Sequence, residues 1–284
     1  MSREPKRCVF CGSVGPLTRE HFWPRWMHEI LPIPGKPEHY QERSTYTGLF
    51  RPAQPSRRTQ RQGATHTITF RSVCARCNNG WMSQCEEEAA PVLRRLLSGT
   101  PSTVEPPGRM ALANWLISKV LLADARYLED TVMGFAERIN FRTARAMPSA
   151  LAIRIGWTAT TAFSGSFYRH ATTIGKNVYD APPDGRKNTH SIFFGMGQLF
   201  VFALIDGGGN FSLDAAGGHL VDIVPLHEPL AWPPRASTDA EARQVAQCLD
   251  DLLKSGRVRW LPQPNATDKS TDKSAPSGLR ETPR

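Results

Sequence analysis

Apolar positions recur at helical or strand spacing along most of the chain, and the pattern changes character near residue 100. Spacings of three and four residues predict helices over residues 78–98, 110–128, 131–146 and 238–254. In the first of these, Glu86, Glu87 and Glu88 are expected on the solvent side, and Pro91 predicts a kink or a restart.

Strand signals are interspersed with these helices. Alternating or β-branched runs predict strands at 66–73, 151–157, 167–174, 191–205 and 219–225. Residues 17–30 begin extended, until Pro24 ends the strand or opens a short helix. The pattern therefore predicts an α+β protein: an N-terminal module over residues 1–100, then a mixed α/β domain over 101–261 that is first helical and then strand-rich.

Two segments lack a regular pattern. Residues 31–66 are rich in Pro, Gly, Arg, Gln, Ser and Thr, which predicts an irregular insertion that is partly disordered until it meets a partner. Residues 262–284 contain the near-repeat TDKSTDKS, and their composition predicts a disordered tail.

Composition places the chain among ordinary globular proteins, with 40% hydrophobic and 21% charged residues. Its apolar runs are too short to cross a bilayer. The basic N-terminus is not followed by the apolar stretch of a secretory signal, so we expect a cytoplasmic protein.

Charge is unevenly distributed. The chain carries a net +9, and residues 1–80 contain 13 Lys or Arg against 5 Asp or Glu, a net +8. A compact basic module suits a polyanion such as nucleic acid. Surface solubility is the alternative explanation of this excess.

Four of the six cysteines form two CxxC pairs, Cys8 with Cys11 and Cys74 with Cys77. Two such turns supply the four thiolates of a tetrahedral zinc site, which leaves no open position and makes the zinc structural. Unrelated buried cysteines and a redox dithiol are the alternatives. No thioredoxin-like pattern surrounds either pair. Cys85 and Cys248 lie on apolar helical faces and are expected to be buried thiols.

The segments CVFCG, LTREHFWP and VCARCNNGWM together resemble the HNH endonuclease family in its four-cysteine branch. The shared pattern is a CxxC knuckle, an acidic residue followed by His (Glu20 and His21), and a second CxxC followed directly by Asn78. The resemblance covers residues 8–98. It implies a treble-clef ββα-metal fold and hydrolysis of phosphodiester bonds in DNA.

The resemblance also implies roles for these residues. Glu20 and Asn78 would hold Mg²⁺ or another divalent cation, and His21 would act as general base on the attacking water. The family commonly has Asp where this chain has Glu20, and a central Asn where this chain reads ITFRSV. A zinc-stabilised nucleic-acid-binding module without catalysis, and a protein-interaction scaffold, are the competing interpretations.

Further residues are assigned from position and type. Arg76, inside the second knuckle, is the best candidate for gripping substrate, and the arginines of the insertion (Arg57, Arg58 and Arg61) are candidates for phosphate contacts. Trp23, Trp26 and Trp81 are expected to pack around the zinc core rather than to stack on bases. His28 is expected to be structural.

Overall fold

The structure is a computed structural model of the 284-residue chain. It describes residues 6–31, 38–45, 54–62, 68–127, 130–175, 187–208, 219–224, 226–254 and 259–260. The predicted tail over residues 262–284 lies outside the described residues.

The N-terminal part is a hairpin followed by a helix. Strand β1 (Leu17–His21) pairs antiparallel with β4 (Thr69–Cys74), in a register that places Glu20 opposite Phe70. The 3-10 helix η1 (Arg25–Glu29) follows Pro24, as the proline predicts. After β4 the chain turns through α1 (Ala75–Cys77) and the π-helical turn η3 (Asn78–Met82) into α2 (Ser83–Ser98).

The break in this helical segment is not at Pro91, as expected, but at Gly80. Helix α2 runs through Pro91 without interruption, whereas Gly80 has φ −101° and ψ −113°, outside helical values. Pro91 is in the middle of α2 and removes one backbone hydrogen bond, while the buried residues around it, Ala89, Val92 and Leu93, pack the helix into the core. Gly80, which has no Cβ, takes the irregular conformation more readily.

The segment predicted to be an irregular insertion contains a paired hairpin. Strand β2 (Glu38–Thr45) pairs antiparallel with β3 (Gln54–Gln62), with an irregularity between Gln41 and Arg43. Backbone pairing does not need an apolar face, which is why the mixed composition of this segment gave no strand signal. The irregular-insertion prediction is therefore wrong for these two stretches.

The remainder of the chain is built on a five-stranded antiparallel sheet with the order β11-β6-β10-β9-β7. Its strands are β6 (Leu151–Trp157), β7 (Phe167–Thr172), β9 (Thr189–Met196), β10 (Leu199–Asp206) and β11 (Leu220–Asp222). The single strand-like run predicted at 191–205 is two strands, because Gly197 at φ +60° turns the chain between them.

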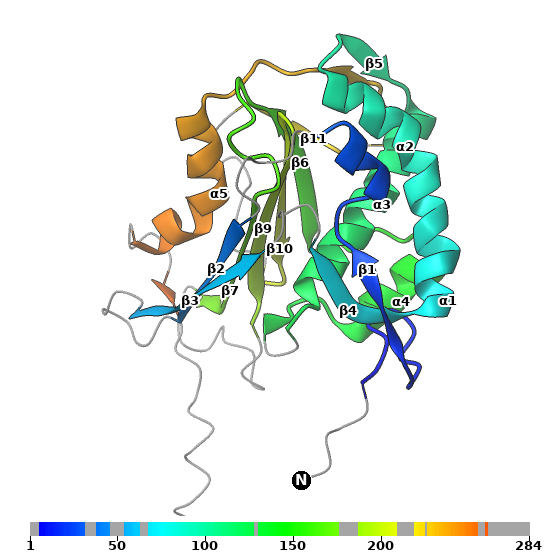
Figure 1. The fold of residues 1–284 in the computed structure, drawn as a ribbon, viewed down its shortest axis with the longest axis vertical. Helices are drawn as coiled ribbons and strands as arrows, with labels where there is room; N and C mark the ends of the chain where they lie inside the picture. Colours follow the sequence, from blue (N-terminus) through cyan, green and yellow to red (C-terminus); the bar gives the residue numbers. More distant parts are fainter. Residues whose placement is uncertain are drawn as a thin grey trace, which may run out of the picture.

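Helices cover both faces of this sheet (Figure 1). Helix α5 (Asp239–Lys254) packs on one face, against Phe193, Phe200 and Phe202. Helix α3 (Pro106–Asp124) lies on the other face of the sheet, beside α2. Apolar residues occur around its whole circumference, because the helix is buried between α2 and the sheet. The shorter α4 (Phe135–Ala144) joins this side.

Two pairs of short strands complete the fold. They are β5 (Ser102–Val104) with β12 (Leu230–Trp232), and β8 (Ile174–Gly175) with β13 (Arg259–Trp260). The whole is a mixed α/β arrangement with antiparallel sheets, as the sequence predicts at that level. Within the described ranges, no helix is long and apolar enough to span a bilayer.

The predicted module and the predicted second domain share one core. A single buried hydrophobic cluster includes Phe22 and Phe70 of the hairpin region together with Phe194 of the sheet. The rings of Phe22 and Phe167 have centroids 4.8 Å apart, and those of Phe22 and Phe194 are 5.0 Å apart. The boundary at residue 100 therefore separates sequence patterns, while the packing is continuous across it.

Candidate functional site

The four cysteines of the two CxxC pairs meet at the foot of the β1–β4 hairpin. Cys8 and Cys11 lie on a tight turn in which the Cys8 N–H donates to the Ser13 carbonyl and Gly12 has φ +69°. Cys74 ends β4, and Cys77 is in α1. All four Sγ atoms lie within 4.8 Å of one another. Thiolates around a tetrahedral zinc are about 3.8 Å apart, so this cluster fits a zinc ion.

The ionisation of these thiols differs with their surroundings. Burial raises the pKa of both Cys8 and Cys77. Cys74 is more exposed, and hydrogen bonds from the Cys77 backbone and the Ser13 side chain outweigh its burial and lower its pKa to about 6. A zinc ion would deprotonate the remaining thiols, so its binding releases protons.

Glu20 and His21 are consecutive on β1, so their side chains point to opposite faces of the strand. Glu20 is buried at 7% exposure. His21 is half-buried, and burial followed by the positive charge of Arg25 holds its pKa below the ordinary value. A neutral imidazole at neutral pH can accept a proton, as a general base must.

The Glu20 carboxylate is bound by a residue that the sequence analysis did not single out. Lys119 of α3 is 2% exposed, and its Nζ lies 2.6 Å from Glu20 Oε1. The same Nζ donates to the His21 carbonyl at 2.9 Å and lies 3.9 Å from Glu86 Oε2. The signal for Lys119 was present in the sequence, because it is a cation in the middle of the apolar run from Leu112 to Ala123.

Glu86 corrects a second expectation. It is half-buried and faces Lys119 rather than solvent, whereas its neighbours Glu87 and Glu88 are exposed as predicted. Desolvation raises the pKa of Glu86, against the opposing effect of Lys119. Glu86 is four residues after Met82 and three before Ala89, both of which are buried, so it lies on the inner side of the helix although its charge favours solvent.

Asn78 approaches β1 as the resemblance implies, and its side chain contacts Thr18. Its Nδ2 donates to Thr18 Oγ1 at 3.1 Å, and Thr18 Oγ1 in turn donates to the Val73 carbonyl. Thr18 comes two residues before Glu20 on β1, and the pairing of β1 with β4 is irregular between them. The hairpin and the helix start therefore bring Asn78 to β1, beside Thr18.

The donor set for a catalytic divalent cation is incomplete in this arrangement. Of the two predicted cation ligands, Glu20 and Asn78, only Glu20 has a carboxylate, and Lys119 already neutralises that carboxylate. Among the residues that the structure describes, the four cysteines are the one group of three or more His, Cys, Asp or Glu side chains placed to share an ion. The residues present fit zinc, and they do not fit a second cation at Glu20 while Lys119 stays in place.

The other predicted residues fall in three places. Arg76 is exposed on α1, next to the zinc cluster. Arg57, Arg58 and Arg61 belong to β3, and their side chains lie outside the described residues. Trp23 is buried, and Trp81 packs edge-on against Phe10 at 4.9 Å, as expected of core residues.

The structure also shows where the third tryptophan, the other two cysteines and His28 lie. Trp26 is half-buried under the guanidinium of Arg94, 4.3 Å from its ring centroid, so it is packed rather than offered to a base. Cys85 and Cys248 are buried thiols, as predicted. His28 is half-buried on η1.

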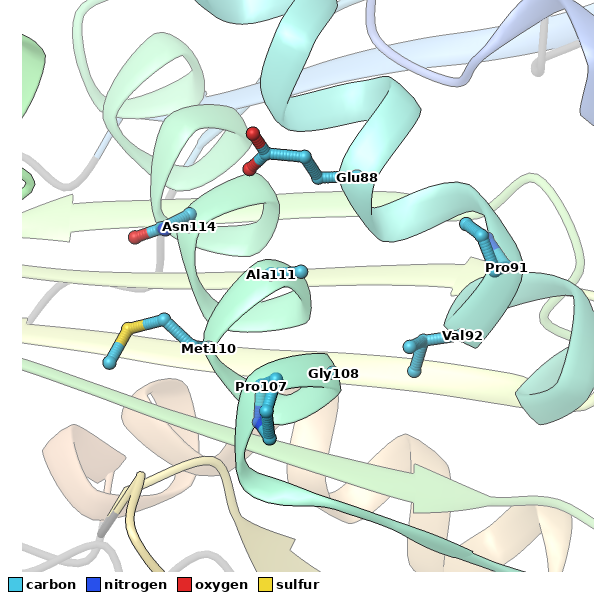
Figure 2. A pocket seen from close by; sticks show the side chains of 8 residues that line it. All are labelled: Glu88, Pro91, Val92, Pro107, Gly108, Met110, Ala111 and Asn114. Carbon is cyan, nitrogen blue, oxygen red and sulfur yellow. The ribbon is translucent and has the colours of Figure 1, made fainter.

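A shallow groove between α2 and α3 lies apart from these residues. Figure 2 shows its lining side chains, among them Glu88, Pro91, Met110 and Asn114. None of the predicted site residues lines it. The groove therefore adds no group to the candidate site.

Comparison with known proteins finds no match for this chain among protein-family models, curated proteins or solved structures.

Proposed function

We propose that the N-terminal hairpin and helix form a zinc-stabilised endonuclease module of the HNH type, which hydrolyses phosphodiester bonds in DNA. In this proposal β1, β4 and the helical segment from Ala75 onward are the ββα unit of a treble clef. The observation that carries it is the hydrogen bond from Asn78 to Thr18 of β1, two residues before Glu20, together with the four-thiol cluster.

His21 is the general base of the proposed reaction. A water loses a proton to the imidazole as its oxygen bonds to phosphorus, and the opposite P–O ester bond breaks, its oxygen taking a proton from solvent. The lowered pKa of His21 supports this role, because the ring stays neutral at neutral pH.

The resemblance assigns a divalent cation to Glu20 and Asn78. When bound, such an ion would stabilise the negative charge that develops on the phosphate. The ion pair between Lys119 and Glu20 opposes that assignment, so the proposal for His21 is made without any step through the cation.

Basic residues supply the proposed affinity for DNA. Arg76 is exposed beside the zinc cluster, and residues 1–80 carry most of the net positive charge. Phosphate contacts of this kind give affinity and orientation rather than sequence preference. Binding should therefore weaken steeply with salt.

Nicking of supercoiled plasmid tests the proposal. The zinc-loaded protein is incubated with plasmid in Mg²⁺, in Mn²⁺ and after removal of loosely held divalent ions. We expect nicking that His21→Ala abolishes while zinc content and circular dichroism are unchanged. His227→Ala is the matched control, because His227 is exposed at 80% and far along the chain. Absence of nicking under every condition by folded, zinc-loaded protein would contradict the proposal.

Binding of nucleic acid without cleavage is the second candidate, and the Lys119–Glu20 ion pair favours it. A module whose acidic residue is permanently neutralised keeps the fold and the basic surface but not the cation chemistry. Salt-dependent binding of DNA by wild-type protein, with no nicking, would support this candidate over the first.

A further inference from the structure

Three oxygen atoms from two separate elements lie near the ammonium of Lys119. Glu20 Oε1 and the His21 carbonyl come from β1, at 2.6 and 2.9 Å, and Glu86 Oε2 comes from α2, at 3.9 Å. The ring of Trp115 lies on α3 one turn earlier, with its centroid 5.9 Å from Nζ. Lysine is almost never buried to this degree unless it is paired.

Two carboxylates and a carbonyl are the oxygen donors that a hard divalent cation would use. Here they converge on the Nζ of Lys119, which donates hydrogen bonds to Glu20 Oε1 and the His21 carbonyl and forms a longer ion pair with Glu86 at 3.9 Å. The position that a divalent ion would take beside Glu20 is thus filled by a cation that is covalently part of the chain.

Displacing this ammonium would be unfavourable. Lys119 is 2% exposed, and a cation that has lost its partners in a buried position cannot recover its hydration without opening the structure. An incoming Mg²⁺ would also have to lose part of its own water shell, which it does reluctantly. Both effects favour the resident ammonium over an exchanged ion.

We propose that Lys119 is a tethered cation that stands in place of a divalent ion at Glu20, so that zinc at the four thiols is the metal this module needs. Lys119 is then a positioning residue: it fixes the Glu20 carboxylate and, through the His21 carbonyl, the backbone of the proposed base. The inference rests on the proposed function in assigning Glu20 to the site. If Lys119 replaces the divalent ion, we expect the proposed cleavage to continue after loosely held divalent ions are removed.

Direct titration with Mn²⁺ tests this without reference to activity. Free Mn²⁺ is measured by electron paramagnetic resonance in zinc-loaded, full-length protein. The wild type should show no Mn²⁺ site that depends on Glu20. Wild type and Glu20→Gln should therefore bind Mn²⁺ equally. Lys119→Met leaves Glu20 and Glu86 unneutralised and should gain one Mn²⁺ per chain, at least tenfold tighter than any wild-type binding. The double variant E20Q/K119M should lose that site.

Lys119→Arg is the matched control, because it keeps the charge and should gain no Mn²⁺ site. A wild-type Mn²⁺ site that Glu20→Gln abolishes would overturn the inference. So would a folded, zinc-loaded Lys119→Met that gains none. If Lys119→Met does not fold, the comparison of wild type with Glu20→Gln still decides whether the inference holds. Equal Mn²⁺ binding by the two supports it, and loss of a wild-type site in Glu20→Gln overturns it.

The nicking assay separates failure of this inference from failure of the proposed function. Zinc-loaded protein that nicks DNA with added Mn²⁺ but not without it supports the nuclease and overturns the tethered cation. Mn²⁺ titrations with the expected results, together with no nicking under any condition, support the tethered cation and contradict the nuclease.

Discussion

At the scale of single residues, the pair formed by Asp124 and His190 makes stability depend on pH. Both side chains are fully buried, with His190 Nδ1 2.7 Å from Asp124 Oδ1. Asp124 also accepts the backbone N–H groups of Val132 and Met133. Burial lowers the pKa of His190, against the opposing hydrogen bond to Asp124.

A lowered folded-state pKa means that protonation favours the unfolded chain. The stability that depends on neutral His190 is present above pH 6.5, the ordinary value for histidine, and is lost as the pH falls through that value toward the folded-state pKa. Between pH 8 and pH 5 the wild type should therefore lose more stability than His190→Gln, which has no imidazole to protonate. Urea unfolding at the two pH values measures this. Parallel losses in both proteins would contradict it.

Arg109 is a second buried residue with a role that its type alone does not reveal. It is 5% exposed, and its guanidinium donates to the carbonyls of Ile223, Glu228 and Asp222 at 2.7, 2.8 and 2.6 Å. It thereby joins the start of α3 to the segment after β11. Lysine cannot reproduce this planar three-way contact.

Arg109→Lys should therefore lower the free energy of unfolding by about 2–3 kcal/mol, because buried carbonyls lose their donors. Met110→Ala on the next position is the matched control, since Met110 is 43% exposed and should change stability by less than about 0.5 kcal/mol. Equal effects of the two substitutions, in urea titrations at pH 7, would show that the carbonyl contacts are not what Arg109 contributes.

At the scale of elements, the four-cysteine cluster joins the hairpin to the helix. The double substitution of Cys74 and Cys77 to Ser removes half of the four ligands and should reduce bound zinc from one equivalent to none, with loss of the N-terminal fold. Zinc content by mass spectrometry and far-ultraviolet circular dichroism measure both. Cys85→Ala is the control, because Cys85 is a buried thiol outside the cluster and should keep its zinc. Retention of zinc and melting temperature by the double variant would refute the ligand assignment.

Which elements the sequence could predict depends on whether local spacing or tertiary contact determines them. The strand at 151–157 and the helix ending at 254 were found because their apolar positions repeat over a whole element. The zinc ligands were found because CxxC spacing is itself the signal. The β2–β3 hairpin has no apolar face to reveal it, and the Lys119–Glu20 contact joins residues 99 positions apart. Only the folded structure shows such a pair.

At the scale of the whole molecule, the packing of the hairpin against the sheet bears on whether the N-terminal module is independent. Phe22 and Phe70 are 1% and 3% exposed, and their neighbours include Phe167, which lies on β7. Glu20 depends on Lys119 of α3 for its counter-charge. A chain cut at residue 100 would expose these rings and leave the Glu20 carboxylate without its buried partner.

We therefore expect a fragment of residues 1–100 to bind one zinc ion, because all four ligands are present, but to unfold without a cooperative thermal transition and to bind the dye ANS. The matched truncation removes residues 262–284 instead, and it should leave the melting temperature within about 2 °C of full length, since a segment whose composition predicts disorder adds little to stability. Calorimetry of both proteins distinguishes the two expectations. A sharp transition in the 1–100 fragment would mean that the zinc cluster alone supports the module, and that the shared core is an interface between two independently stable parts.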